Sequence, residues 1–188
     1  MLSEELKLKT KEKHQQLEVK IVGAIKAIRQ RKDYVDLLQI FAGYFYELEI
    51  LIKQTLSNNV LPDFSLRRKA AALQADLLSM SASMPERISN ENLPIIKNNL
   101  QAIGALYVME GSTLGGGVIT KIISAKLPAE KAFTFFEGYG EKTIEMWNSF
   151  KTSINAISLT KEETAIIIES ANETFKKFSL YFDLINAD

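Results

Sequence analysis

The chain of 188 residues contains no cysteine, and this absence excludes several classes of chemistry. Disulfide bonds, thiolate nucleophiles and the usual zinc or iron–sulfur sites all need that residue. The chain also has a single histidine, so a di-iron bundle site, which uses two Glu-x-x-His motifs, cannot be built. A cysteine-free chain is compatible with a reducing compartment, and we expect a cytoplasmic protein.

The chain also lacks an excess of one charge and a long uninterrupted apolar run. Lys plus Arg equals Asp plus Glu at 23 each, so no overall field attracts nucleic acid or a membrane surface. The N-terminal residues are charged and have no apolar region of a secretory signal. The longest apolar region, 103–123, is interrupted by Glu110, Ser112, Thr113 and Lys121, which disfavours a bilayer span. We therefore expect neither nucleic acid nor membrane as a partner.

Strand-like alternation is scarce, and the apolar residues recur at helical spacing along almost the whole chain. With 46% hydrophobic residues and no low-complexity linker, the sequence predicts one all-α domain, a multihelical bundle over 1–188, with about seven helical segments. The predicted landmarks are a cap at Ser3, a first helix to about Val19 that continues to Ala27, a cap at Asp33, Pro94 in the first turn of a long segment that Pro128 ends, and a capping box of Thr160 with Glu163.

His14 is the first candidate for a site. It lies one turn after Thr10 and one turn before Glu18 on one helix face, with Lys7 and Lys11 nearby. A ligating imidazole needs a carboxylate or carbonyl to fix its tautomer, and Glu18 is placed for this. One imidazole suits a metal that brings most of its own ligands, as haem iron does. A surface histidine in a lysine-rich helix is the alternative.

The second candidate is "YVMEGSTLGGGVITKII" at 107–123, which has helical flanks around Gly111, Gly115, Gly116 and Gly117. Each glycine inside a helix costs roughly 1 kcal/mol relative to alanine, so the run needs a reason. It matches neither a phosphate-binding loop nor a G-x-S-x-G elbow, and no strand precedes it. A helix end, a close helix–helix contact and a bare backbone surface for a flat ligand remain open, although the resumed periodicity favours a bend within a helix.

Together, "LKLKTKEKHQQLE" and "YVMEGSTLGGG" resemble the haem oxygenase family, and in particular its bacterial branch associated with bacteriophytochromes. This resemblance implies that His14 is the ligand of the haem iron and that Glu18 is its hydrogen-bonding partner. It also implies that Lys7 and Lys11 face the haem propionates.

The same resemblance makes the glycine run the distal helix, with Gly111, Gly115 and Gly116 at the family's glycine positions. Ser112 stands where mammalian members carry an aspartate that orders water around bound oxygen. Tyr107, Val108 and Glu110 belong to the bacterial form of this motif. Gly111, Ser112, Gly115 and Gly116 are therefore the candidate catalytic positions.

The C-terminal "ESANETFKKFSLYF" is similar to the family's last helix. There Phe175 and Phe182 are expected to line the pocket, and Phe178 occupies the place of a mammalian asparagine. Lys151 is the best match for a second propionate anchor. The candidate haem-contacting residues are Lys7, Thr10, Lys11, Glu18, Tyr107, Gly117, Lys151, Phe175, Phe178 and Phe182.

The resemblance implies a haem oxygenase, in which haem b is both substrate and cofactor. Dioxygen and electrons would convert it to biliverdin, carbon monoxide and ferrous iron. No flavin or nicotinamide motif is present, so an external donor such as a ferredoxin, flavodoxin or reductase is expected, and a biliverdin-using photoreceptor is a further candidate partner. The alternatives are a non-catalytic haem carrier or sensor, a thiaminase-like enzyme, which the lack of cysteine disfavours, and an interaction domain.

Overall fold

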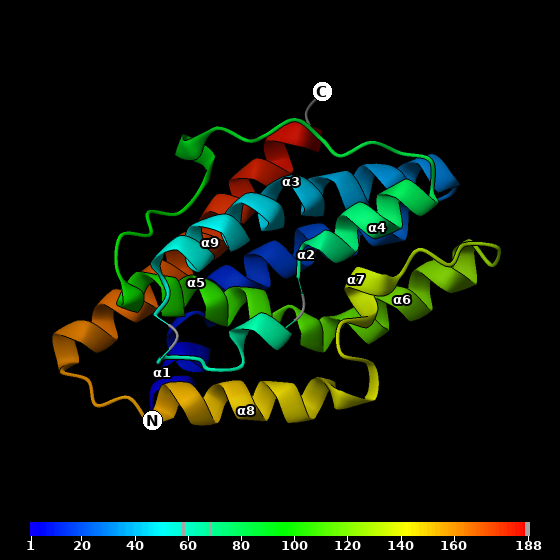
Figure 1. Cartoon of the computed structure of the whole chain (residues 1–188). Coiled ribbons are helices and arrows are strands. Elements are labelled where there is room, and N and C mark those ends of the chain that lie inside the picture. The colour runs from blue at the N-terminus through cyan, green and yellow to red at the C-terminus, as the bar shows by residue number, and fades with distance from the viewer. Residues whose placement is uncertain (58, 68, 187–188) are drawn as a thin grey trace.

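The computed structural model describes residues 1–57, 59–67 and 69–186. In it, one helix lies at the centre and the others pack around it (Figure 1). Within these ranges the chain forms α-helices and short 3₁₀ helices and no strand, which confirms the predicted all-α class. The α-helices are α1 (Leu2–Lys9), α2 (Lys11–Ala27), α3 (Arg31–Thr55), α4 (Ala71–Ser79), α5 (Asn99–Gly111), α6 (Thr113–Lys126), α7 (Thr134–Glu137), α8 (Thr143–Asn155) and α9 (Lys161–Asn186). The 3₁₀ helices are η1 (Phe64–Leu66), η2 (Asn90–Asn92) and η3 (Gly140–Lys142).

Helix α5 is the centre of the core. Residues 102–110 are all buried, and α5 packs along α9. A Cβ at Gly104 would fall on the carbonyl oxygen of Ile167 and 2.8 Å from the Cβ of Ser170. Glycine at this position therefore lets the two helix backbones approach closely. In Figure 1, α8 runs along the lower edge beside α1, and α7 lies on α6.

An aromatic cluster joins α9 to α3. The ring of Phe178 stacks on Tyr44 with 4.6 Å between centroids and contacts the edges of Phe41 and Phe45. The hydroxyl of Tyr44 donates to the carbonyl oxygen of Thr174 at 2.8 Å, which satisfies the polar atom in this apolar region. The cluster fixes α9 on α3 through dense contacts of edge and face.

The predicted helix landmarks are partly correct. Thr160 and Glu163 form the predicted capping box, with the Thr160 amide donating to Glu163 at 2.8 Å and the Glu163 amide donating to Thr160 at 3.1 Å. The predicted cap at Asp33 is wrong, because Gln30 is the capping residue and Asp33 is the third residue of α3, where it accepts from the Gln30 amide at 3.1 Å. The Pro128 landmark is also confirmed, since α6 ends at Lys126.

Two further predicted starts are also wrong. Ser3 lies inside α1, and its amide donates to Asn155 of α8 at 2.9 Å, so a tertiary hydrogen bond takes the place of the expected cap. The segment after Pro94 stays extended, and α5 begins only where the Asn98 side chain caps the Gln101 amide at 3.0 Å.

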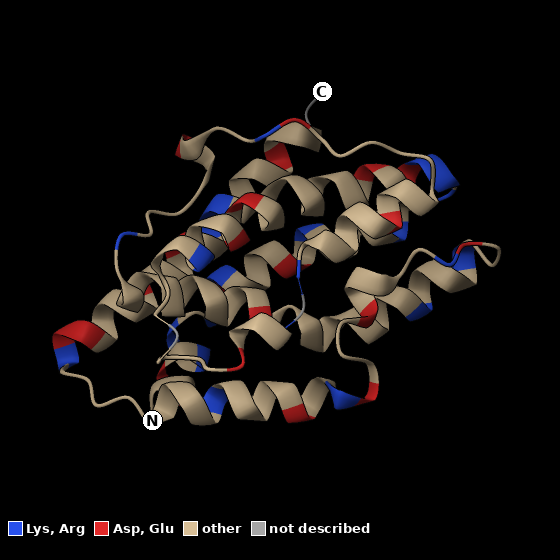
Figure 2. Ribbon diagram, in the orientation of Figure 1, with Lys and Arg blue, Asp and Glu red and all other residues tan. Residues whose placement is uncertain are grey.

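The long apolar stretch is bent. Helices α5 and α6 meet at Ser112, so the predicted bend within the glycine-rich segment is confirmed. The stretch Asn99–Lys126 is long and apolar enough to cross a membrane by length and composition, with a mean hydropathy of 1.2, but 56% of that window is buried inside the structure. This degree of burial is that of core helices in a globular protein. Charges of both signs are interspersed along the other helices (Figure 2).

Candidate active site

The outer face of α2 carries His14. Its side chain is 57% exposed, and its Nδ1 lies 4.0 Å from a carboxylate oxygen of Glu18, one turn further along the helix. This distance is too long for a hydrogen bond, but it shows that Nδ1 is turned toward the carboxylate. The ring also contacts the edge of Phe175 on α9, with 5.4 Å between centroids and an interplanar angle of 68°. Nδ1 is therefore the ring nitrogen that faces Glu18, and Nε2 is the one that does not.

At one end of this face, the residue that joins α1 to α2 interacts with α5. Thr10, at the junction of α1 and α2, is buried and donates to the carbonyl oxygen of Leu6 at 2.7 Å. Burial raises the pKa of Tyr107 on α5, and a hydrogen-bonding interaction with the Thr10 side chain opposes part of that rise. His14 lies one turn after Thr10, and Gly111 lies one turn after Tyr107. His14 and Gly111 are therefore each one helical turn away from the contact between Thr10 and Tyr107.

The other end of α2 is held by α6. The ammonium group of Lys126 donates to the carbonyl oxygens of Lys26 at 2.7 Å and Ile28 at 3.0 Å, at the C-terminal end of α2. A cation there also favours the negative end of the helix dipole. Thus α2 and the α5–α6 pair contact each other on both sides of the stretch that carries His14.

One face of α6 is directed at α2 between these contacts. Gly115, Val118, Ile122 and Lys126 are spaced by three, four and four residues, so they share the helix face that reaches α2 at Lys126. We call Gly111, Gly115, Val118 and Ile122 the distal strip. Val118 is 63% exposed, and a Cβ at Gly115 would have no atom within 4 Å. The distal strip is therefore apolar, exposed at Gly115 and Val118 and half-buried at Gly111 and Ile122.

The four glycines of the motif have different surroundings. A Cβ at Gly111 would lie 3.8 Å from the ring of Trp147, an ordinary contact, whereas one at Gly116 would fall on the carbonyl oxygen of Phe136 in α7. A Cβ at Gly117 would have open space around it, but Gly117 lies about 200° around α6 from Gly115. Glycine at 116 thus has a packing reason, and the predicted contacts of Gly116 and Gly117 with haem stay predictions.

Ser112 occupies the bend itself. Its hydroxyl donates to the carbonyl oxygen of Met109 at 2.7 Å, and the hydroxyl of Thr113 donates to the carbonyl oxygen of Glu110 at 2.7 Å. Both carbonyls lie in the last turn of α5, where the helix leaves acceptors without intrahelical partners. The Ser112 hydroxyl therefore stabilises the bend.

The remaining candidates are divided between the surface and the core. Lys7 and Lys11 are exposed on the side of α1 and α2 that carries His14. Lys151 lines a cavity of about 240 Å³ between α1 and α8, beside Met1 and Glu4. Phe175, Phe178 and Phe182 are all buried on α9, and of these Phe175 is the one seen against His14.

Sequence reasoning missed a buried ion-pair network under the bend. The guanidinium of Arg67 donates to Glu110 at 2.7 Å and to both carboxylate oxygens of Asp63, at 3.0 and 2.9 Å. The hydroxyl of Tyr139 donates to the two oxygens of Glu110 at 3.1 and 3.0 Å. Burial lowers the pKa of Arg67, but the hydrogen bonds and charges of Asp63 and Glu110 raise it above its usual value overall. We call Asp63, Arg67, Glu110 and Tyr139 the bend network.

The signal for this network in the sequence is weak. Glu110 stands out as an acid within a long apolar segment, which a buried partner would explain. Nothing in the spacing identifies Arg67, because it is 43 residues away.

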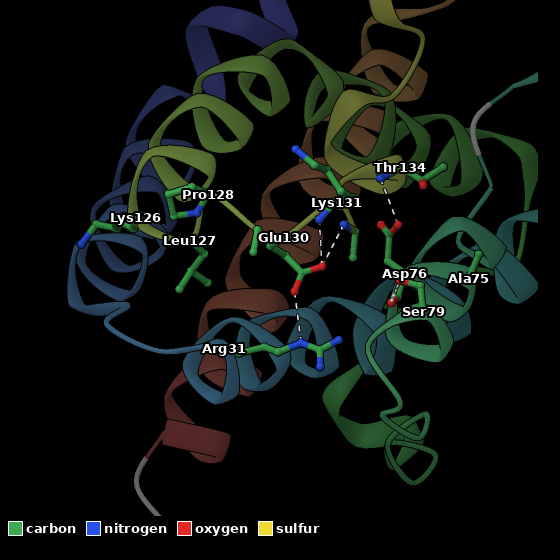
Figure 3. Close-up of a pocket in the computed structure, with 12 residues that line it drawn as sticks. Arg31, Ala75, Asp76, Ser79, Lys126, Leu127, Pro128, Glu130, Lys131 and Thr134 are labelled. Carbon is green, nitrogen blue, oxygen red and sulfur yellow. Dashed lines mark hydrogen bonds and ion pairs between the residues drawn. The ribbon is translucent and has the colours of Figure 1, made fainter.

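A further hollow lies elsewhere, between α3, α4 and the loop from α6 to α7 (Figure 3). Its volume is about 770 Å³, and no candidate site residue lines it. Its polar groups mainly hold the loop in place. Asp76 accepts from the amides of Thr134 and Phe135 at 3.0 and 2.9 Å, and Glu130 pairs with Arg31 at 3.1 Å.

A sequence model of the haem oxygenase family matches residues 1–183. The chain belongs to the haem oxygenase family. It is 26% identical over 182 residues to the haem oxygenase PigA of Pseudomonas aeruginosa, covering 94% of this chain and 88% of that protein.

Solved haem oxygenase structures share the fold. The NO- and CO-bound enzyme from Neisseria meningitidis superposes with a TM-score of 0.85 at 22% identity, covering 100% of this chain and 92% of that one. The enzyme from Leptospira interrogans gives 0.76 at 19% identity, covering 97% and 98%. The haem complex of haem oxygenase-1 from Synechocystis sp. PCC6803 gives 0.73 at 16%, covering 99% and 92%.

Membership of the haem oxygenase family confirms the predicted family and fold, and it confirms the predicted activity, oxidative degradation of haem, at the level of the family. The residues of this haem oxygenase that bind the iron and the propionates stay predictions. So do its electron donor and its location in the cell.

Proposed function

We propose that this haem oxygenase binds haem b between α2 and the distal strip, with Nε2 of His14 as the protein ligand of the iron. The observation that carries the proposal is that His14 and the exposed part of the distal strip, Gly115 and Val118, lie between two contacts: that of Thr10 with Tyr107 and that of Lys126 with the C-terminal end of α2. A flat ligand can enter between two helices that are held together at both ends of such a stretch.

The residues on this face suit the chemistry of haem. The distal strip offers an apolar backbone surface to the porphyrin ring, since Gly111 and Gly115 carry no side chain and Val118 is apolar. The exposed ammonium groups of Lys7 and Lys11 can meet carboxylates at the ring edge. Lys151 is a third candidate for that role. Iron and porphyrin, once bound, supply the redox centre and the carbon framework that is cleaved.

The side chains around His14 prepare it for this role. Glu18 faces Nδ1 and favours the tautomer in which that nitrogen carries the proton, which leaves the lone pair on Nε2. Phe175 packs against the ring and restricts its rotation.

The wider setting follows from the same proposal. Electrons come from an external donor such as a ferredoxin, flavodoxin or reductase, and biliverdin leaves as the product together with carbon monoxide and ferrous iron. A biliverdin-using photoreceptor is a candidate recipient, and we place the protein in the cytoplasm. These partners are tested by reconstitution with each purified donor.

The decisive experiment compares His14→Ala with Gln15→Ala, an exposed neighbour that serves as the matched control. Each protein is titrated with haemin, the Soret band is recorded, and a reductant is added in air to follow biliverdin. We expect His14→Ala to lose the histidine-ligated Soret spectrum and turnover, to regain part of both with added imidazole, and to keep the far-UV spectrum of the fold. Wild-type turnover by His14→Ala without imidazole would refute the ligand assignment.

A haem carrier or sensor is the second candidate function, because Ser112 stands in the aspartate position and its hydroxyl proton is used by the Met109 carbonyl. It predicts a Soret band that survives reductant and oxygen without formation of biliverdin. The same titration therefore separates the two functions.

A further inference from the structure

The bend network contains two buried charges, which is unusual in a protein interior. The side chains of Arg67 and Glu110 are only 1% and 3% exposed, and removing each charge from water costs several kcal/mol. Glu110 also sits in the last turn of α5, where the helix dipole disfavours an anion. An apolar pair could fill this space at no loss of stability, so stability alone does not account for the network.

The contacts of the network converge on the bend from three directions. Arg67 comes from the segment after η1 and also donates to the carbonyl oxygen of Met146 in α8 at 3.2 Å. Its guanidinium carbon lies 5.6 Å from the ring centre of Phe150. Tyr139 comes from the loop after α7, between Gly138 and Gly140. The carboxylate of Glu110 is thus held by partners on separate elements.

The loop that carries Tyr139 is shaped for this contact. Gly138 and Gly140 adopt φ values of 58° and 56°, which side chains rarely tolerate, so glycine at both positions lets the backbone present Tyr139 to Glu110. A Cβ at Gly138 would lie 3.6 Å from Thr113, the first residue of α6. The loop therefore packs on both sides of Ser112.

We propose that Glu110 is a positioning residue for the haem oxygenase reaction: clamped by Arg67 and Tyr139, it fixes where α5 ends and so sets the position of the distal strip over the substrate. Directional hydrogen bonds to a charged group specify geometry more narrowly than apolar packing does. Gly111 follows Glu110 directly, so a shift of the carboxylate moves the strip backbone. This inference rests on the proposed function for its consequence in catalysis but not for its structural part.

The structural part is tested on the haem-free protein by hydrogen exchange of backbone amides. Glu110→Gln keeps the shape of the side chain, but it removes the charge and replaces one of the two acceptor oxygens with an NH2 donor. We expect the amides of residues 112–116 to exchange about tenfold faster or more, while those of α9 change by less than about threefold. Glu47→Gln is the matched control, because Glu47 is also a buried carboxylate that Arg87 binds at 2.6 and 2.8 Å, but it lies on α3.

An equal increase along the whole chain, or no increase at 112–116, would overturn the proposal. Where Glu110→Gln does not fold, Tyr139→Phe removes one hydroxyl and is measured in the same way, with a smaller local increase expected. Because haem is absent, the outcome is independent of whether the His14 assignment holds.

The catalytic part is read from the product. Glu110→Gln is expected to change the ratio of biliverdin isomers at least about twofold, while the affinity for haemin stays within about threefold of wild type because His14 and the lysines are untouched. An unchanged isomer ratio would show that the network does not position the reaction. A loss of affinity equal to that of His14→Ala would show a general structural role instead.

Discussion

The face of α2 that carries His14 and the buried side of the α5–α6 bend are built in opposite ways. His14, Glu18 and the nearby lysines are exposed and have few partners. Packing in the fold therefore does not dictate these residue types, and their side chains can bind a ligand. On the buried side, Arg67 and Glu110 are enclosed and fully hydrogen-bonded. In the proposed site, the face that carries His14 would provide the chemistry, and the bend network behind the opposite wall would provide its position.

The largest loss of stability is expected when the ion pair between Arg67 and Glu110 is broken. Arg67→Met leaves Glu110 as an uncompensated buried charge, and such losses cost about 3–5 kcal/mol of unfolding free energy. Urea unfolding followed by circular dichroism measures the cost. By contrast, His14→Ala should change the unfolding free energy by less than about 0.5 kcal/mol, since its side chain is exposed.

The double variant Arg67→Met, Glu110→Met provides the control for this prediction. Because it removes both charges together, it should recover much of the stability that the single variant loses. A double variant as unstable as the sum of the two single variants would show that the pair is not coupled.

A smaller effect is expected from Gly116→Ala. The added Cβ would fall on the carbonyl of Phe136, so α6 and α7 must move apart, and overpacking of this kind costs about 1–3 kcal/mol. Thermal unfolding measures the loss. A stability equal to that of the wild type would show that α7 can yield, and the packing reason for glycine at 116 would then fail.

The exposed face that carries His14 and the buried bend network also differ in how far the sequence alone could predict them. His14 and the glycine run are rare residue types in their surroundings, so chemical reasoning could find them. The capping box of Thr160 and Glu163 is local, and it was confirmed for that reason. Ser3 was misplaced as a cap because its partner, Asn155, comes from the other end of the chain.

The bend network could not be predicted for a related physical reason. Arg67 and Glu110 are joined only by the tertiary fold, and no periodicity or motif links them. The different environments of Gly115 and Gly116 were equally hidden, because they depend on where α7 packs. Sequence reasoning thus predicted the residues proposed to carry the chemistry, which stay predictions, and missed the bend network behind the distal strip.

Gly115→Ala should separate stability from binding. Nothing lies within 4 Å of the added Cβ, so the higher helix propensity of alanine should stabilise the fold by up to about 1 kcal/mol. The same methyl group stands on the distal strip and should weaken haemin binding. Gly23→Ala on α2, which also meets open space, is the control, with similar stabilisation and unchanged affinity. Unchanged haemin affinity in Gly115→Ala would count against contact between the strip and the ring.

The smallest effect is expected from Lys11→Gln. Lys11 is exposed, so its attraction to a propionate is screened by water and is worth roughly 0.2–1 kcal/mol, about a 1.5- to 5-fold loss of haemin affinity. This loss should shrink as salt rises from 0.05 to about 0.5 M, because the Debye length then falls well below 10 Å. Lys13→Gln is the control, since Lys13 lies near Glu12 and Gln16 and not on the face of His14. Equal losses in both variants would show that general charge, and not a placed cation, attracts the propionates to α2.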